Sequence, residues 1–358
     1  MNRFANSWVS AALSLTIGIA ILLGLPGMID EYTLIQITIY AVMAILGVSL
    51  GFIWGYGGIL CFGQAAFFGL GSYTYALAVI NMGDSTVPFL LAVAVPALFA
   101  ALLGYVIFYG RLSDVYMGVI TLTVTLILFN LINSTAGPEW KIGAAALGGF
   151  NGIPAIPTLN LPGQPDKVLD PKEFFSLTFV CLLTVYLGLR VLISSKIGRV
   201  IIAARENEQR VLLLGYDARA YKLFSFTLGG AIAGLAGCLF ANWGAFTSPT
   251  IFGLAQSAQI IIWVIVGGLG TLVGPVVGCV AIQWLTMQIG TQQVLNSNLV
   301  LGVILVVFVL LVPRGIVPSL GDLGERLFRQ LSRSNRPASK VPPTAEIPAY
   351  IVAKEEIV

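Results

Sequence analysis

Two long stretches of this chain contain no Asp, Glu, Lys, Arg or His. The first runs from Tyr32 to Gly83 and the second from Leu223 to Pro313. Soluble domains carry a charged residue at about one position in four, whereas a lipid bilayer excludes charge because burying it in hydrocarbon is costly. These two stretches therefore predict membrane-spanning segments.

The composition of the whole chain agrees with this prediction. Of 358 residues, 57% are hydrophobic and 10% are charged, so we expect an all-α polytopic membrane protein. The chain has no histidine, which removes the commonest zinc ligand and general base. The four cysteines occur singly in apolar segments and predict packing residues, not a metal or redox motif: Cys61, Cys181, Cys238 and Cys279.

Ten segments are apolar enough to cross a bilayer, for which a helix needs about 20 residues. They are Trp8 to Gly27, Leu34 to Trp54, Ile59 to Ile80, Pro88 to Tyr109, Val115 to Asn133, Phe174 to Ile193, Leu223 to Ala241, Gln256 to Leu269, Gly274 to Ile289 and Leu299 to Val312. The first lacks a small-x-small cleavage pattern in LPGMID, so we expect it to be retained as a helix and not removed as a signal peptide. The eighth is short and ends in GGLGTLVGP, which predicts a broken or re-entrant segment.

Ten crossings place both termini on one side of the membrane. With the termini inside, only Lys141, Lys167 and Lys172 of the 19 Lys and Arg residues lie outside, as the positive-inside rule requires. We therefore expect a transmembrane domain over residues 1–315 with an external loop at 134–173. A cytoplasmic tail would follow at 316–358, disordered from about residue 334, where the sequence becomes Pro-rich and polar.

The stretch 195–222, SKIGRVIIAARENEQRVLLLGYDARAYK, interrupts the apolar sequence with six bases and three acids. Its apolar residues recur at helical spacing: Ile197, Val200, Ile201 and Ala204. Glu206 and Arg210 stand four apart in the favourable order, and Gly215 occupies the position of a left-handed helix cap. The stretch thus predicts a short amphipathic helix at the cytoplasmic surface, serving either as a solvated connector or as a contact for lipid or a soluble partner.

Glycines recur at four-residue spacing in two places, namely Gly47, Gly51 and Gly55, and again Gly270, Gly274 and Gly278. Small residues at this spacing let helices approach closely, so helix packing is one interpretation. The other is that Gly267, Gly268 and Gly270 open a helix whose backbone lines a solute path.

Gln64 is a polar residue in the apolar segment GYGGILCFGQAAFFGLGSY, residues 55–73. Such a residue either bonds a neighbouring helix or faces a pathway, because a polar group in lipid needs a partner or a use. In the second interpretation its neighbours Gly63 and Phe67 line the same path.

Charge is almost absent from the proposed spans, where only Arg190 occurs. Ion-coupled carriers commonly place acids, Lys or His in the membrane, so we do not expect coupling to an ion gradient. The chain also lacks a GxxxxGK[ST] phosphate loop and is not expected to hydrolyse ATP. Energy for active transport would then come from a partner, and the 195–222 stretch is the largest cytoplasmic surface that could receive it.

Five motifs in succession carry a family resemblance: GYGGILCFGQAAFFGLGSY, GGFNGIP, SKIGRVIIAARENEQRVLLLGYD, GGAIAGLAG followed by SP, and IIIWVIVGGLGTLVGPVVG. From Leu34 to Gly315 the chain resembles the membrane subunits of branched-chain amino acid ABC importers, specifically the larger of the two sister permeases. Members often carry His where Gln64 stands here.

This resemblance implies a bacterial inner-membrane permease that pairs with a homologous sister permease, two cytoplasmic ABC ATPase subunits and a periplasmic solute-binding protein. ATP and Mg would bind the ATPase subunits, this chain would bind no cofactor, and transport would proceed by alternating access. We expect no nucleic-acid partner. The implied ATPase-coupling segment contains Gly198, Arg199, Ala204, Arg205, Glu206, Glu208, Arg210 and Gly215.

Other functions stay open at this point. Related permeases carry urea and short amides, and the sequence does not separate those solutes from leucine or valine. A passive channel or facilitator would not need the charged cytoplasmic stretch. An intramembrane enzyme is disfavoured, because the spans contain no His, acid or Lys for acid–base chemistry.

Overall fold

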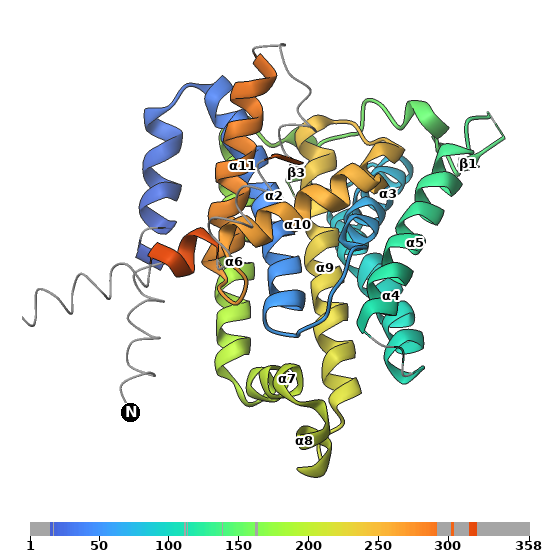
Figure 1. Cartoon of the computed structure of the whole chain (residues 1–358). Coiled ribbons are helices and arrows are strands. Elements are labelled where there is room, and N and C mark those ends of the chain that lie inside the picture. The colour runs from blue at the N-terminus through green and yellow to red at the C-terminus, as the bar shows by residue number, and fades with distance from the viewer. Residues whose placement is uncertain are drawn as a thin grey trace, which may run out of the picture. The chain divides into compact units, whose positions relative to one another are not determined.

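The computed structural model describes residues 15–16, 18–110, 112, 114–137, 139–161, 164–291, 302–303 and 315–320. Most of these residues are helical (Figure 1). Six helices are long and apolar enough to cross a membrane, namely α2 (Glu31–Gly55), α3 (Gln64–Met82), α4 (Thr86–Tyr109), α5 (Asp114–Asn133, apolar from Tyr116), α6 (Pro171–Ser194) and α9 (Ala218–Gly244). Three apolar helices are shorter: Gly18–Met28, α10 (Leu254–Gly267) and α11 (Val273–Thr291, apolar to Gln288).

The middle of the ten-segment prediction agrees with these helices. Segments two to nine of that prediction each coincide with a helix. The first is described only at residues 15–16 and from residue 18 onward. The tenth, Leu299 to Val312, falls almost entirely outside the described residues, as does the tail.

The third segment begins later than expected. α2 ends at Gly55, and residues 56–63 are not helical before α3 starts at Gln64. Gly58 adopts φ +69°, a conformation that favours glycine. The prediction of a helix from Ile59 was therefore wrong, because the glycines around it extend the turn into a buried connector.

The start of α2 is fixed by a side-chain cap. Asp30 accepts hydrogen bonds from the backbone N–H of Thr33 at 3.1 Å and from its hydroxyl at 2.8 Å. An oxygen at this position satisfies one of the free N–H groups of the first turn. The Thr33 hydroxyl hydrogen bond is the main reason that the pKa of Asp30 lies below its usual value.

The core forms where α9 packs on α3 and α4, in places with backbone against backbone. A Cβ on Gly234 would lie 2.6 Å from the Ala92 carbonyl oxygen of α4, and one on Gly237 would lie 2.8 Å from the Ser72 nitrogen of α3. Below these contacts Phe67 meets Phe226 edge-on at 5.4 Å and Phe99 at 6.2 Å. The three helices therefore form one closely packed unit.

The first glycine repeat packs against the α10–α11 hairpin, and the second lies mainly within that hairpin, where Gly274 and Gly278 meet the backbone of Gly267. Gly47 and Gly51 on α2 lie against the ring of Pro275 on α11, and Gly55 lies against Gly270 in the α10–α11 turn, with 2.9 Å between a Cβ built on Gly55 and the Gly270 nitrogen. Neither repeat was paired with the other in the sequence interpretation, which treated them separately.

α10 and α11 form a helical hairpin. α10 has 14 residues, and the turn after it contains Gly268 at φ +115° and Gly270 at φ +84°. In Figure 1 α10 lies across the bundle while α11 turns back beside α2. At about 1.5 Å per residue α10 is shorter than the roughly 30 Å hydrocarbon core, which agrees with a re-entrant segment.

The loop between α5 and α6 is ordered in its described part. It contains β1 (Lys141–Ile142) paired with β2 (Ala145–Ala146), the 3-10 turn η1 (Gly149–Asn151), and β3 (Asn160–Leu161) paired with β4 (Gln164–Val168). Ile153 pairs with Thr247 just before the turn η2 (Pro249–Phe252). Buried Ser85 donates its N–H to the Asn160 side chain at 3.1 Å, so the loop is fixed to the ends of α3, α4 and α9.

Candidate functional site

The charged stretch forms two short helices at the end of the bundle opposite the β-hairpins (Figure 1). These are α7 (Lys196–Glu206) and α8 (Glu208–Leu213). The helical prediction is confirmed, but one helix was expected. Asn207 breaks it with φ −161° and ψ 100°, and its side chain caps α8 by accepting from the Arg210 N–H. The expected Glu206–Arg210 pair within one helix therefore does not exist.

α7 is held against the bundle by its small residues. Gly198 lies directly on the end of α6 at Leu192 and Ile193, where no larger side chain fits. Ala204 packs with Val211 of α8 and Ala218 of α9, and all three are buried. The apolar face that the sequence predicted is thus used for intramolecular packing.

Arg205 reaches away from α7 to the end of α2. Its guanidinium donates a hydrogen bond to the Gly55 carbonyl. The stem of the side chain lies on Gly58, where an added Cβ would meet the Arg205 Cγ at 2.7 Å. A cation at this place is favourable, because the carbonyl end of a helix is its negative pole.

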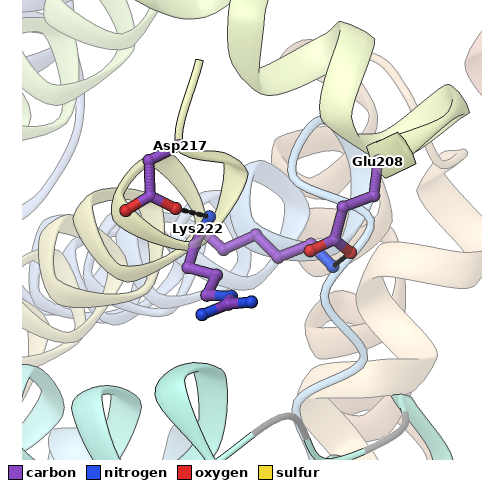
Figure 2. A network of polar contacts seen from close by, with 4 residues as sticks. Glu208, Asp217 and Lys222 are labelled. Atoms are coloured by element: carbon purple, nitrogen blue, oxygen red, sulfur yellow. Dashed lines mark hydrogen bonds and ion pairs between the residues drawn. The ribbon is translucent and has the colours of Figure 1, made fainter. Parts of the chain in front are cut away.

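Glu208 is also engaged within the chain. Its carboxylate accepts a hydrogen bond from Lys222 on α9 at 2.6 Å (Figure 2). Asp217, drawn beside them, caps α9 by accepting from the Arg219 N–H at 3.1 Å. These contacts fix α8 relative to the first turn of α9.

The remaining charged residues expected in a coupling segment face solvent. Arg199, Glu206 and Arg210 are exposed, and Glu206 lies 3.8 Å from Arg205 in a loose surface pair. Gly215 has φ +86° and ends α8 in the left-handed conformation. Of the eight residues expected in the coupling segment, Gly198 and Ala204 are therefore buried spacers. Arg205 and Glu208 contact other elements of the chain, although their side chains are 42% and 39% exposed.

The end of α8 also exposes an apolar cluster that the sequence interpretation missed. Leu213 is 88% exposed and Leu214 75%, and Leu212 and Tyr216 are about half exposed. Three leucines in succession cannot all face the inner side of a short helix, so the run VLLLGY contained the signal. We refer to Leu212, Leu213, Leu214 and Tyr216 as the α8 tip.

Gln64 makes the contacts of a packing residue. It is buried, and its Nε2 donates to Ser49 Oγ of α2 at 2.7 Å and to the Gly229 carbonyl of α9 at 3.2 Å. Its Oε1 is buried with no hydrogen-bond partner among the described residues. Phe67 belongs to the aromatic core, and Gly63 lies against Thr121 of α5.

The candidate path residues fall in two separate places. Gln64 lies on the side of α2 that carries Ser49, and the Gly267–Gly270 turn lies on the side that carries Gly51 and Gly55. Positions 49 and 51 are about 200° apart around a helix. The structure therefore does not bring Gln64 together with this turn, because α2 separates them.

A cavity of ≈150 Å³ lies at the end of the bundle near the ordered loop. It is lined by Ile35, Thr38, Thr158, Leu159, Leu169, Pro171, Phe174, Asn242 and Trp243. The Oδ1 of Asn242 is buried without a hydrogen-bond partner among the described residues. None of the candidate path residues lines this cavity.

Comparison with known proteins identifies the family. Residues 31–311 match the model of the branched-chain amino acid transport system / permease component family. The chain belongs to this family. The match covers all the helices from α2 to α11, including α7 and α8.

Two relatives of this permease are both described as the high-affinity branched-chain amino acid transport system permease protein LivM. The protein of Escherichia coli (strain K12) is 29% identical over 340 residues, which are 87% of this chain and 76% of the relative. That of Salmonella typhimurium (strain LT2) is 30% identical over 341 residues, with the same coverage. No solved structure matches the chain.

Family membership and the apolar helices together identify the chain as a multi-pass membrane permease. A protein of this class is a transport subunit. No group of three His, Cys, Asp or Glu residues within the described part of the chain could hold a metal ion.

Proposed function

We propose that this permease translocates branched-chain amino acids across the bacterial inner membrane as one subunit of an ABC importer. It would pair with a homologous sister permease, two cytoplasmic ATPase subunits that bind ATP and Mg, and a periplasmic solute-binding protein. The observation that carries this proposal is the family match over residues 31–311. The names of the two relatives support the solute, and neither favours urea, short amides or a passive channel.

For the topology we propose ten segments with both termini in the cytoplasm, over a permease domain at residues 1–315 with a tail at 316–358. The α10–α11 hairpin is compatible with this count, because a re-entrant hairpin returns the chain to the side from which it came. The segments at 134–173 and 195–222 lie at opposite ends of the bundle, which supports their assignment to opposite faces of the membrane.

The ATPase-facing surface that we propose is made by α7 and α8. They project at one end of the bundle (Figure 1), with Arg199, Glu206 and Arg210 exposed beside the apolar α8 tip. An exposed apolar cluster bordered by charges is typical of a protein-binding surface. Movement of the ATPase subunits would act on this surface and favour one of two orientations of the permease.

Gln64 and the Gly267–Gly270 turn remain proposed positions for the solute path. The buried Oε1 of Gln64 supports the first, and the positive-φ glycines of the α10–α11 turn support the second. Because α2 separates the two positions, they would belong to different parts of a path.

Reconstituted transport tests the proposed function directly. Liposomes containing the four-subunit membrane complex would be supplied with ATP and the binding protein, and uptake of leucine, isoleucine, valine, urea and acetamide compared. We expect ATP-dependent uptake of the three branched-chain amino acids only. Uptake of urea or acetamide instead, or accumulation driven by this chain without ATPase subunits, would contradict the proposal.

A further inference from the structure

The end of α2 is a junction between four segments of the chain. The α2–α3 connector begins there, and Arg205 reaches it from α7. On the other side Gly55 lies against Gly270 of the α10–α11 turn. The Tyr56 side chain, next along the chain, lies near the Leu272 backbone, Arg190 and Arg205. The cytoplasmic helices and the α10–α11 hairpin thus meet at a single point.

The backbone at this point has an unusual division of partners. The carbonyls of Phe52, Ile53 and Trp54 accept from N–H groups of residues 56–59, as the last carbonyls of a helix commonly do. The Gly55 carbonyl instead accepts from Arg205, which is 150 residues away in sequence. The last carbonyl of α2 is therefore satisfied by another element.

We propose that Arg205 is the positioning residue that fastens α7 to the end of α2 and so to the α10–α11 turn. This proposal rests on the proposed role of α7 and α8 as the ATPase-facing surface. Gly58 makes the link possible, because its positive φ and missing side chain admit the stem of Arg205. Gly55 continues it, since only a glycine lets α2 touch the backbone of Gly270.

The link differs from an ATPase-docking role in a measurable way. A docking residue contributes to the affinity for the ATPase subunits, whereas a link inside the permease transmits their movement. Breaking the link should therefore leave the ATPase subunits bound and hydrolysing ATP. The α10–α11 turn, however, should no longer respond to their movement. Arg199 and Arg210, whose side chains are exposed on the same two helices, provide comparison positions.

Arg205→Met removes the hydrogen-bond donor and keeps an unbranched stem for the contact with Gly58. Arg205→Lys restores a donor, and Arg210→Met, on the proposed ATPase-facing surface, is the comparison for a docking residue. Each variant would be purified with its sister permease and ATPase subunits and reconstituted with the binding protein. Copurification of ATPase subunits, ATP hydrolysis and solute uptake would be measured.

We expect uptake by Arg205→Met to fall about tenfold or more, the effect of losing one charge-assisted hydrogen bond from the active state. ATPase copurification and hydrolysis should stay at the level of the unsubstituted complex, and Arg205→Lys should recover most of the uptake. Unchanged uptake in Arg205→Met would overturn the proposal. Loss of the ATPase subunits from Arg205→Met alone would also overturn it, because Arg205 would then be a docking residue.

A second measurement follows the turn itself. Leu269 is 40% exposed in the α10–α11 turn, so Leu269→Cys can be labelled with a water-soluble maleimide after the four native cysteines are changed to alanine. We expect labelling to change when ATP hydrolysis is trapped with vanadate, and Arg205→Met to abolish that change. Labelling that does not change on trapping in the unsubstituted background, or that changes equally in Arg205→Met, contradicts the link. Loss of the Arg205→Met chain from the membrane also contradicts it.

The two proposals fail separately. If the unsubstituted complex carries no branched-chain amino acid, the proposed function is wrong, and labelling at Leu269 still tests the link. If the unsubstituted complex transports normally and Arg205→Met does too, only the link is wrong.

Discussion

Gln64 occupies the one position where the function of a single side chain is in question. Its Nε2 joins α3 to Ser49 of α2 and to Gly229 of α9, which are contacts that hold three helices together. Hydrogen bonds between helices in a membrane contribute about 1 kcal/mol each. The packing role therefore predicts an effect on stability and not on transport.

Gln64→Leu keeps the volume of the side chain and removes its polar atoms. The proposed path position predicts a loss of uptake in addition. We expect the free energy of unfolding to fall by about 1–2 kcal/mol, because two hydrogen bonds are lost, and uptake per assembled complex to fall as well. Thermal unfolding of the purified complex and uptake normalised to assembled protein measure the two effects. Gln209→Leu, at an exposed position of α8, is the control, and a complex that is less stable but transports normally would make Gln64 a packing residue only.

For single residues, the sequence showed which side chains are important more often than it showed which residues they contact. Gln64 stood out because a polar residue in an apolar segment needs a reason. Arg205 and Glu208 stood out through charge, but their partners Gly55 and Lys222 come from other elements. Contacts of this kind depend on how helices meet in space, which local spacing does not determine.

Among the elements, the α2–α11 contact depends most on small residues. Gly51 lies against the Pro275 ring, and a ring cannot move aside as a flexible side chain does. We expect Gly51→Val to lower the free energy of unfolding by about 1–3 kcal/mol through overpacking. Gly188→Val on α6 has nothing within 4 Å of its added Cβ and should cost little, so equal thermal unfolding curves for the two variants would contradict this packing.

The α8 tip gives a prediction for association. Leu213 is 88% exposed, and an apolar side chain buried at the centre of an interface commonly contributes about 2 kcal/mol or more. Leu213→Asp should therefore weaken binding of the ATPase subunits by that amount and lower their yield in copurification. Gln209→Asp adds the same charge on α8 at an exposed polar position, and similar losses in both variants would show a charge effect instead.

Element boundaries were predictable where local chemistry sets them. Gly215 after α8 holds the left-handed cap position that was predicted for it. The cap at Asp30 was not identified, and α2 begins at Glu31, three residues before the expected Leu34. The break at Asn207 was not predicted, because the apolar spacing continues through it from Ala204 to Val211. Packing of Ala204 and Val211 against Ala218 bends the chain there.

For the whole molecule, the predicted topology is open to chemical labelling. Gln164 begins β4 in the loop between α5 and α6, Asn207 lies between α7 and α8, and both are exposed. In intact cells, Gln164→Cys should react with a membrane-impermeant maleimide, and Asn207→Cys should react only after the cytoplasmic face is opened. The reverse pattern at either residue would overturn the proposed orientation.

The broad class of the molecule followed from the absence of charge in residues 32–83 and 223–313, because the bilayer constrains composition more strongly than any local signal. The contact of the α2 glycine repeat with Pro275 and Gly270 did not follow. Both repeats were visible as small-residue stripes, but four-residue spacing says only that a helix can be approached closely. Which helix approaches it is decided by the fold.

The 14 residues of α10 also bear on how the chain is made. A segment much shorter than the hydrocarbon core enters a bilayer poorly on its own, so during biosynthesis this hairpin needs a protein surface to receive it. α2 offers that surface through Gly47, Gly51 and Gly55, and the ribosome completes α2 about 200 residues before it reaches α10. The order of synthesis therefore matches the order of packing. The short helix α10 emerges late, after α2, the surface that receives it, is already in the membrane.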